Sequence, residues 1–138
     1  MSTSQVVPHD PRSVPLGLRL TTRAAVVCAH LLAAQSPDRI RSVLERMKGG
    51  ARPATLAEAN SARETVLAVS LAAGGQQGCL ARSLATVLLC RVRGQWPTWC
   101  VGVRTHPPFA AHAWIEAEGV LVGENAPADY FRRFFTVP

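Results

Sequence analysis

Two residues of this sequence could act together as a nucleophile and the base that activates it. Cys79 lies in the stretch GQQGCLARSL, and His112 lies 33 residues further on in FAAHAWIE. A thiol is mostly protonated at neutral pH, and it becomes a useful nucleophile when a helix N-terminus and an imidazolium stabilise its thiolate. Either residue alone is more often structural, but the two together indicate thiolate chemistry.

The residues before the cysteine suit a helix that begins at Cys79. Three glycines between positions 74 and 78 let the backbone turn closely. The amides of the first helical turn are then free to face an oxyanion. We expect Gly78 to take part in this arrangement, and Gln76 or Gln77 to add an amide donor.

The histidine belongs to a stretch with the alternation of a β-strand. In AAHAWIEA, the side chains of His112, Trp114 and Glu116 are expected on one face of the strand. The small alanines on the opposite face would let the strand pack closely on a helix.

Helices are predicted for the first two thirds of the chain. Residues 1–17 are proline-rich and are expected to form a mobile arm, and residues 18–138 a single domain. Ser36 and Pro37 are a helix start signal. Apolar spacing and glycine stops predict four helices, at residues 18–34, 36–50 and 54–75 and from Cys79 to about residue 93.

The remaining third has the character of strands. Short runs rich in β-branched and aromatic residues, separated by turn signals, predict strands at residues 99–105, 110–117 and 120–124. The expected fold class is therefore α+β, with N-terminal helices, a central helix that opens at the cysteine, and a small antiparallel sheet.

Composition excludes several other classes of protein. The chain has 138 residues, 15 of them basic and 9 acidic, and its arginines are scattered singly. A solvated surface is therefore a better interpretation than a nucleic-acid patch. The uncharged run at residues 24–37 is shorter than the roughly 20 apolar residues of a membrane span. With no secretory signal at residues 1–15, we expect a cytoplasmic protein without a membrane span.

The other cysteines are expected to be buried core residues. Cysteines occur at positions 28, 79, 90 and 100, without a CxxC pair or an HxxxH pair. Neither a zinc site nor a redox motif is therefore indicated. We assign Cys28, Cys90 and Cys100 to the core, and we expect neither a metal nor a cofactor.

A third of the chain resembles a known family of enzymes. The resemblance covers residues 79–124, CLARSLATVLLCRVRGQWPTWCVGVRTHPPFAAHAWIEAEGVLVGE, and rests on a helix start of the form CL-R-SLA followed by AHAWIE and a hairpin. The family is the cysteine-peptidase module of lasso-peptide biosynthesis, which belongs to the transglutaminase-like, papain-related fold. The combination of motifs is specific, whereas the HAW-E string alone is not.

The resemblance implies a peptidase that removes the leader from a ribosomally made precursor peptide. By matching position, Cys79 would be the nucleophile and His112 the base, and Arg82 would orient the substrate or pair with an acid. An ATP-dependent lasso cyclase would then close the released core. The residues before Cys79 are predicted to be helical, so the resemblance implies the stand-alone form, to which a separate winged-helix protein presents the leader.

Two other functions remain open at this point. Acyl transfer to an amine, as transglutaminases perform it, is the alternative within the same fold. A non-catalytic scaffold that binds peptides or nucleic acid through its arginines is an alternative of a different class.

The third member of the site depends on the register of the last hairpin. The family usually has an aspartate where this sequence has Glu124, and Asn125 is its neighbour. A three-residue loop would place Glu124 opposite His112, and a two-residue turn would place Asn125 there. Because a two-residue type I′ turn needs positive φ at Glu118, we predict the longer loop and Glu124.

The sequence DYFRRFFTVP, residues 129–138, is dense in aromatic and basic side chains. Such a segment either packs on the core or forms an exposed docking strip. We favour packing.

Overall fold

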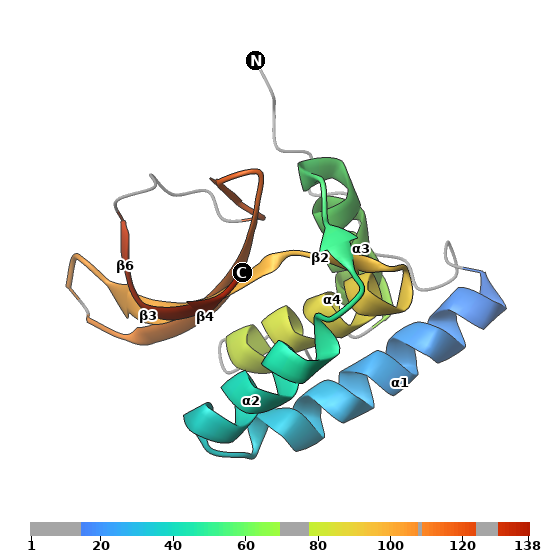
Figure 1. Ribbon diagram of the computed structural model, residues 1–138, viewed down its shortest axis with the longest axis horizontal. Coiled ribbons are helices and arrows are strands. Elements are labelled where there is room, and N and C mark those ends of the chain that lie inside the picture. Colours follow the sequence, from blue (N-terminus) through green and yellow to red (C-terminus); the bar gives the residue numbers. More distant parts are fainter. Residues whose placement is uncertain (1–14, 70–77, 108, 124–129) are drawn as a thin grey trace.

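The protein is built from a group of helices and a strongly curved antiparallel sheet that lies against them (Figure 1). This computed structural model describes residues 15–69, 78–107, 109–123 and 130–138. The helices of this part of the chain are α1 (Leu16–Ala33), α2 (Pro37–Met47), α3 (Leu56–Val69) and α4 (Cys79–Val92). The α+β prediction is confirmed.

The helices begin where local signals predicted them. The Ser36 side chain accepts a hydrogen bond from the Arg39 N–H at 3.4 Å, which caps α2 with proline at its first position. The first helix starts at Leu16, two residues earlier than expected. The predicted extension of α3 to residue 75 lies outside the described residues.

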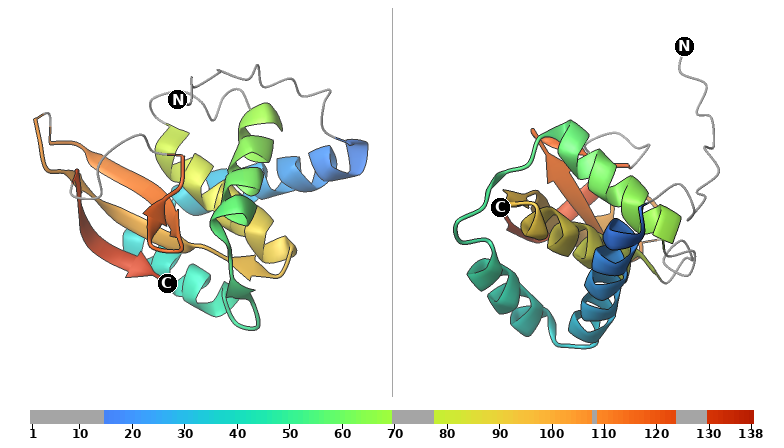
Figure 2. Two further views of the ribbon diagram at one scale, coloured as in Figure 1. Left: turned by 90° about the horizontal axis from the view of Figure 1, so that it is seen from above. Right: turned by 90° about the vertical axis from the view of Figure 1, so that its right-hand side faces the viewer.

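The central helix α4 is the core of the molecule. Residues on most of its sides are buried, from Ala81 to Cys90 with the exception of Arg82. It packs on α1 and α3 on one side and on the strand of His112 on the other, so the sheet and the helices share one core (Figure 2). The nucleophile candidate, Cys79, is therefore the first residue of the helix that has the most buried residues among the four described helices.

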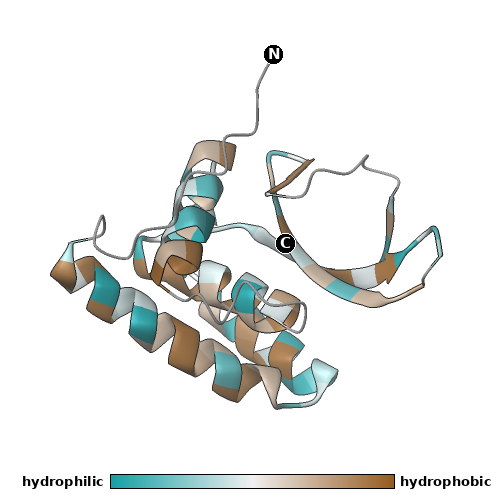
Figure 3. Ribbon diagram, turned by 180° about the vertical axis from the view of Figure 1, so that it is seen from behind, coloured by the Kyte–Doolittle hydropathy of each residue, from teal (hydrophilic) through white to brown (hydrophobic). Residues whose placement is uncertain are grey.

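The first helix leaves much apolar surface uncovered. It buries Thr22, Ala25 and Ala29 against the rest of the molecule, while Leu20, Val27 and other apolar residues are exposed. Figure 3 shows in brown that apolar positions recur along this helix. By length and composition α1 could cross a membrane, and 17% of it is buried. This is weak evidence, because the helix of a globular domain passes the same test.

The main sheet has the strand order β5-β4-β3-β6, with every pair antiparallel. Its strands are β3 (Thr98–Arg104), β4 (Ala111–Ala117), β5 (Val120–Leu121) and β6 (Phe131–Val137). A short parallel pair, β1 (Arg52–Pro53) and β2 (Gln95–Trp96), lies apart from it.

The strand β6 was not predicted. The sequence suggested a packed segment or a docking strip at residues 129–138, and the structure shows a strand that pairs with β3 along its whole length. A register shift between Val101 and Gly102 interrupts the alternation of side chains. The Phe134 side chain is 65% exposed, whereas Val137 is fully buried. Three consecutive residues of β6, Arg132, Arg133 and Phe134, are exposed, so burial along this strand does not alternate with a period of two.

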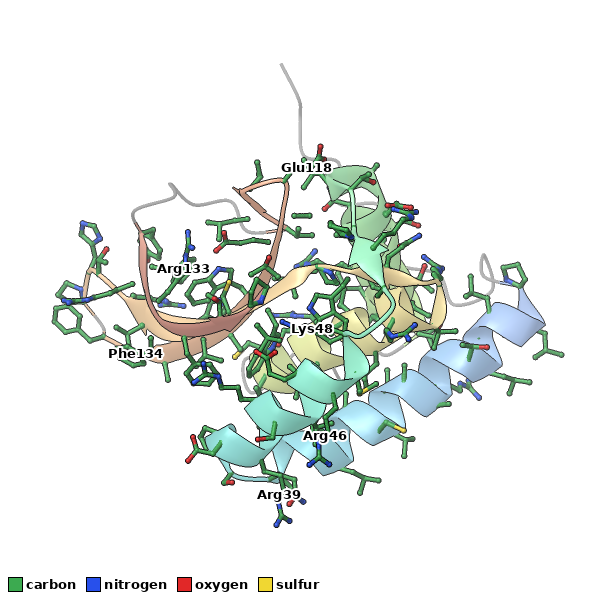
Figure 4. The ribbon with its side chains drawn as sticks, in the orientation of Figure 1. Arg39, Arg46, Lys48, Glu118, Arg133 and Phe134 are labelled. Atoms are coloured by element: carbon green, nitrogen blue, oxygen red, sulfur yellow. The ribbon has the colours of Figure 1, made fainter. Side chains whose placement is uncertain are left out.

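The turn between β4 and β5 is different from the predicted one. Ala117 pairs with Val120, so the turn has two residues, and Glu118 and Gly119 have φ values of 54° and 75°. The predicted three-residue loop is therefore wrong. The Glu118 carboxylate accepts a hydrogen bond of 2.7 Å from the Leu56 N–H at the start of α3, which compensates for the unfavourable backbone (Figure 4).

Candidate active site

Cys79 is the first residue of α4, as the sequence predicted. The residue before it, Gly78, is buried and provides no side-chain cap to the helix. The first-turn amides of α4 are therefore not occupied by such a cap and can face a developing negative charge. Gln77, the other expected oxyanion residue, lies outside the described residues.

The structure brings Cys79 and His112 together. The hydrogen bond with His112 is the largest influence on the thiol of Cys79 and lowers its pKa, and burial opposes this effect. The Ala113 N–H and the positive charges of His112 and Arg82 lower the pKa further. The net result is a pKa below the ordinary value, as a thiolate nucleophile requires.

The strand of His112 also contacts the cysteine through its backbone. Alternate residues of β4 direct their backbone groups toward β5, and the Val122 N–H donates to the Ile115 carbonyl at 3.0 Å. The Ala113 N–H, two residues before Ile115 on β4, donates to the Cys79 sulfur. One strand therefore supplies both a side chain and a backbone hydrogen bond to the cysteine.

The predicted faces of β4 are confirmed. His112, Trp114 and Glu116 lie on the face away from α4, while Ala113 and Ile115 belong to the core that β4 shares with the helices. This outer face is the concave side of the curved sheet, where Figure 4 shows Arg133, with Phe134 on the other side. His112 reaches Cys79 from near the start of the strand.

Arg82 lies close to Cys79, and the role that the resemblance implied for it stays a prediction. It lines, with Cys79, a cavity of about 20 Å³ that has room for roughly one water molecule. Arg63, on α3, lines the same cavity, and sequence reasoning had assigned it no role. Two guanidinium groups therefore border the space beside the sulfur.

The structure separates the remaining cysteines into two groups. Cys90 and Cys100 are buried as predicted, and burial raises the pKa of Cys90 to about 12. Burial and the nearby Glu116 carboxylate raise the pKa of Cys100 as well. The prediction for Cys28 is wrong, because this residue is exposed on α1. It lines an apolar groove of about 760 Å³ between α1, α2 and α4.

The third member of the triad is not placed by the structure. Glu124 and Asn125 both lie outside the described residues. The two-residue turn removes the register argument for Glu124 and would align Asn125 with His112 if the pairing continued. Gly123, the last described residue before them, has a φ of 69°.

Three residues of the sheet that carries His112 had no functional assignment from the sequence. Phe131 of β6 stacks on the imidazole with ring centroids 4.9 Å apart. Glu116 is buried and accepts a hydrogen bond from the Trp114 indole at 2.9 Å. Gly102 of β3 pairs with His112 in the sheet. The density of aromatic residues at 130–135 was the available signal. Because no strand was predicted there, the sequence did not indicate that these residues contact His112.

In the described part of the chain no group of three or more histidine, cysteine or acidic side chains could hold a metal ion. The site that the structure does show consists of a cysteine at a helix start and a histidine on the adjoining sheet. This arrangement is typical of cysteine enzymes of α+β architecture.

Comparison with known families agrees with this class. Residues 22–136 match the family model of the transglutaminase-like superfamily, and the chain belongs to this superfamily. The superfamily includes cysteine peptidases and acyl transferases, which generally act through a catalytic cysteine. No curated protein and no solved structure shows a significant match to the chain.

Proposed function

We propose that this protein is a cysteine peptidase that removes the leader from a ribosomally made precursor peptide, as in lasso-peptide biosynthesis. The observation that carries the chemistry is the hydrogen-bonded pair of Cys79 and His112 at the N-terminus of α4. The resemblance of residues 79–124 to the leader peptidases supports the choice of substrate. The membership of the superfamily is compatible with it.

The reaction follows from the positions of these groups. The Cys79 thiolate attacks the carbonyl carbon of the last leader peptide bond, and the amides of the first turn of α4 stabilise the oxyanion. The His112 imidazolium gives its proton to the leaving amine as the C–N bond breaks and a thioester forms. His112 then takes a proton from water as the water oxygen attacks the thioester. The C–S bond breaks, the leader leaves as a carboxylic acid that ionises in solvent, and the thiolate–imidazolium pair is restored.

The resemblance of residues 79–124 also suggests partners for the proposed reaction. A separate winged-helix protein would present the leader to this domain, and an ATP-dependent cyclase would join the new amine of the core to a side-chain carboxylate. The proposed reaction itself uses no nucleotide, metal or other cofactor. A reducing, cytoplasmic location would keep the Cys79 thiol available. Genes for a short precursor and such a cyclase beside this one would support the proposal.

Cleavage of the precursor by purified protein tests the proposal. Wild-type protein, with the leader-presenting partner, should release leader and core as two fragments whose masses add up to the precursor plus one water. Cys79→Ala should abolish release while precursor binding and the melting temperature are retained. Cys28→Ser, an exposed cysteine remote from the site, is the matched control and should cleave normally. Equal cleavage by Cys79→Ala would reject the proposal.

The same experiment separates hydrolysis from acyl transfer, which the superfamily also includes. Addition of a primary amine, such as a fluorescent cadaverine, offers a second acceptor to the thioester. A peptidase should give mainly the free leader carboxylate, because its acceptor is water. Leader or glutamine side chains that carry the amine as the main product would identify an acyl transferase instead. Binding without either product would indicate a scaffold.

A further inference from the structure

Three aromatic rings form a stack on the concave side of the sheet. The imidazole of His112 lies 4.9 Å from the Phe131 ring, and the Trp114 indole lies 4.9 Å from the same ring. His112 and Trp114 are 5.9 Å apart, and all three planes are within 27° of one another. Since His112 and Trp114 are two residues apart on β4, their rings lie side by side, and Phe131 covers both.

Phe131 reaches these rings across an intervening strand. The strand β3 separates β6 from β4, and its Gly102 pairs with His112 on one side and with Arg133 on the other. A Cβ atom on Gly102 would lie 1.9 Å from the Arg132 carbonyl oxygen. Only glycine therefore lets β6 approach β3 closely enough at this point. The register shift beside Gly102 then places Phe131 over β4.

The indole of the stack is held by a polar network. Its Nε1–H donates to the Glu116 carboxylate at 2.9 Å, and the Cys100 thiol donates to the same oxygen at 3.3 Å. The Arg133 Nε lies 3.3 Å from this oxygen as well. Glu116 is only 6% exposed, so these contacts fix it firmly. The strands β3, β4 and β6 each contribute one partner, and the Trp114 ring cannot turn without breaking the network.

We propose that Phe131 and Trp114 are positioning residues that hold the His112 ring toward Cys79 and favour its protonated form. The proposal rests on the proposed function, because it concerns the same thiolate and imidazolium. An aromatic face attracts a cation that lies within about 6 Å of the ring centroid, so Phe131 stabilises the imidazolium more than the neutral imidazole. The thiolate-imidazolium pair is thereby stabilised relative to the neutral pair.

The charged groups around His112 come from each neighbouring element. They are Cys79 and Arg82 on α4, Arg104 on β3, Glu116 on β4 and Arg133 on β6. The charge of Glu116 is paired with Arg133. The Cys79 thiol and the rings of Phe131 and Trp114 contact the imidazole directly.

The test measures titration and reactivity without any substrate. In a Cys28→Ser background, the His112 ring proton is followed by NMR against pH, and the rate of Cys79 alkylation by iodoacetamide is followed in parallel. Phe131→Leu should lower the midpoint at which the imidazolium loses its proton by about 0.4 to 1.5 pH units. Phe134→Leu is the matched control, since Phe134 lies on the same strand but is exposed, and it should leave the midpoint unchanged.

A second variant covers the case in which Phe131→Leu does not fold. Replacement of Phe131 by pentafluorophenylalanine keeps the size and shape of the ring but reverses its quadrupole, so the midpoint should again fall while the melting temperature stays close to that of the wild type. An unchanged midpoint in this variant overturns the proposal.

The two hypotheses fail in different ways. If the protein cleaves no precursor, the titration of His112 and the reactivity of Cys79 can still show the effect of the stack. If Phe131 has no effect on the midpoint while Cys79 remains the nucleophile, the proposed peptidase stands and the positioning role is rejected.

Discussion

At the scale of single residues, the pKa of the Cys79 thiol differs from the pKa of the two buried cysteines, Cys90 and Cys100. Cys79 is half-buried, contacts a histidine and begins a helix, and its pKa is lowered. Cys90 and Cys100 are buried without such partners, and their pKa values are raised. Reactivity at mildly acidic pH should therefore separate the nucleophile from the core thiols.

Iodoacetamide near pH 6 should modify Cys79 before Cys90 and Cys100. The thiolate form of Cys79 persists down to its lowered pKa, whereas the two buried thiols stay protonated at this pH. His112→Ala removes the largest cause of the lowered pKa and should slow the reaction by about tenfold or more. Peptide mapping by mass spectrometry, with Cys28→Ser to remove the other accessible thiol, measures this. Faster labelling of Cys90 or Cys100 would contradict the assignment of the nucleophile.

The third member of the triad can be identified by comparing two alanine variants. An acceptor that holds the imidazole tautomer is worth orders of magnitude in turnover, so Glu124→Ala should cut turnover far more than Asn125→Ala if Glu124 has this role. Glu124→Asp should retain measurable activity. The reverse ranking of the two alanine variants would give the role to Asn125, in agreement with the two-residue turn.

At the scale of elements, contacts between segments that are distant in the sequence determine the turn conformation at Glu118 and the register between β3 and β6. Glu118 adopts positive φ because its carboxylate binds the start of α3, 62 residues away in the chain. The register shift in β3 and β6 depends in the same way on a glycine that faces another strand.

Gly102→Ala should displace β6 from β3. The added Cβ would meet the Arg132 carbonyl at 1.9 Å, and backbone atoms cannot yield as a flexible side chain would. We expect a loss of about 1–3 kcal/mol or more in the free energy of unfolding, together with slower alkylation of Cys79. Urea titration measures the stability. Gly17→Ala on α1 has no atom within 4 Å of the new Cβ and should cause no such loss.

The start of α3 should make stability depend on pH. Thr55 and Glu58 form reciprocal hydrogen bonds, and Arg52 also pairs with Glu58. The hydrogen bond from Arg52, followed by the one from the Thr55 N–H, lowers the pKa of Glu58 to about 2. Its contribution is therefore present above the unfolded-state pKa of about 4.3 and is lost as pH falls toward 2.

A comparison of wild type with Glu58→Gln should show this dependence. The difference in melting temperature should be largest above pH 5 and should shrink between pH 4 and 2. Calorimetry at several pH values provides the measurement. A difference that stays constant from pH 7 to pH 2 would show that the carboxylate charge has no part in capping α3.

At the scale of the whole molecule, β6 is a strand of the main sheet and contacts the candidate site through Phe131. Deletion of residues 130–138 should abolish the cooperative thermal transition or lower its midpoint greatly, because β3 loses one of its two neighbours and Val137 leaves the core. Circular dichroism during heating tests this. If residues 130–138 were only a docking strip, their deletion would leave the melting temperature nearly unchanged. That result would contradict the role of β6 in the fold.

The sequence predicted what depends on neighbours in the chain and missed what depends on distant ones. Ser36, Pro37 and the glycines mark the helix starts and stops, so α2 and α4 were located closely. The pair of Cys79 and His112 was found because each lies on an element with a clear pattern. The strand β6 and the Phe131 contact were missed. The register shift interrupts the alternation of exposed and buried residues by which a strand is recognised, and the contact lies across β3, far away in the sequence.

The position of β6 in the sequence also affects when the candidate site can be completed during synthesis. A ribosome makes Cys79 and His112 before it reaches Phe131, whose ring stacks on the His112 imidazole. The strand β3 likewise lacks one of its two neighbours until residue 137 has been made. The sheet around the candidate site can therefore be completed only after the ribosome has passed β6.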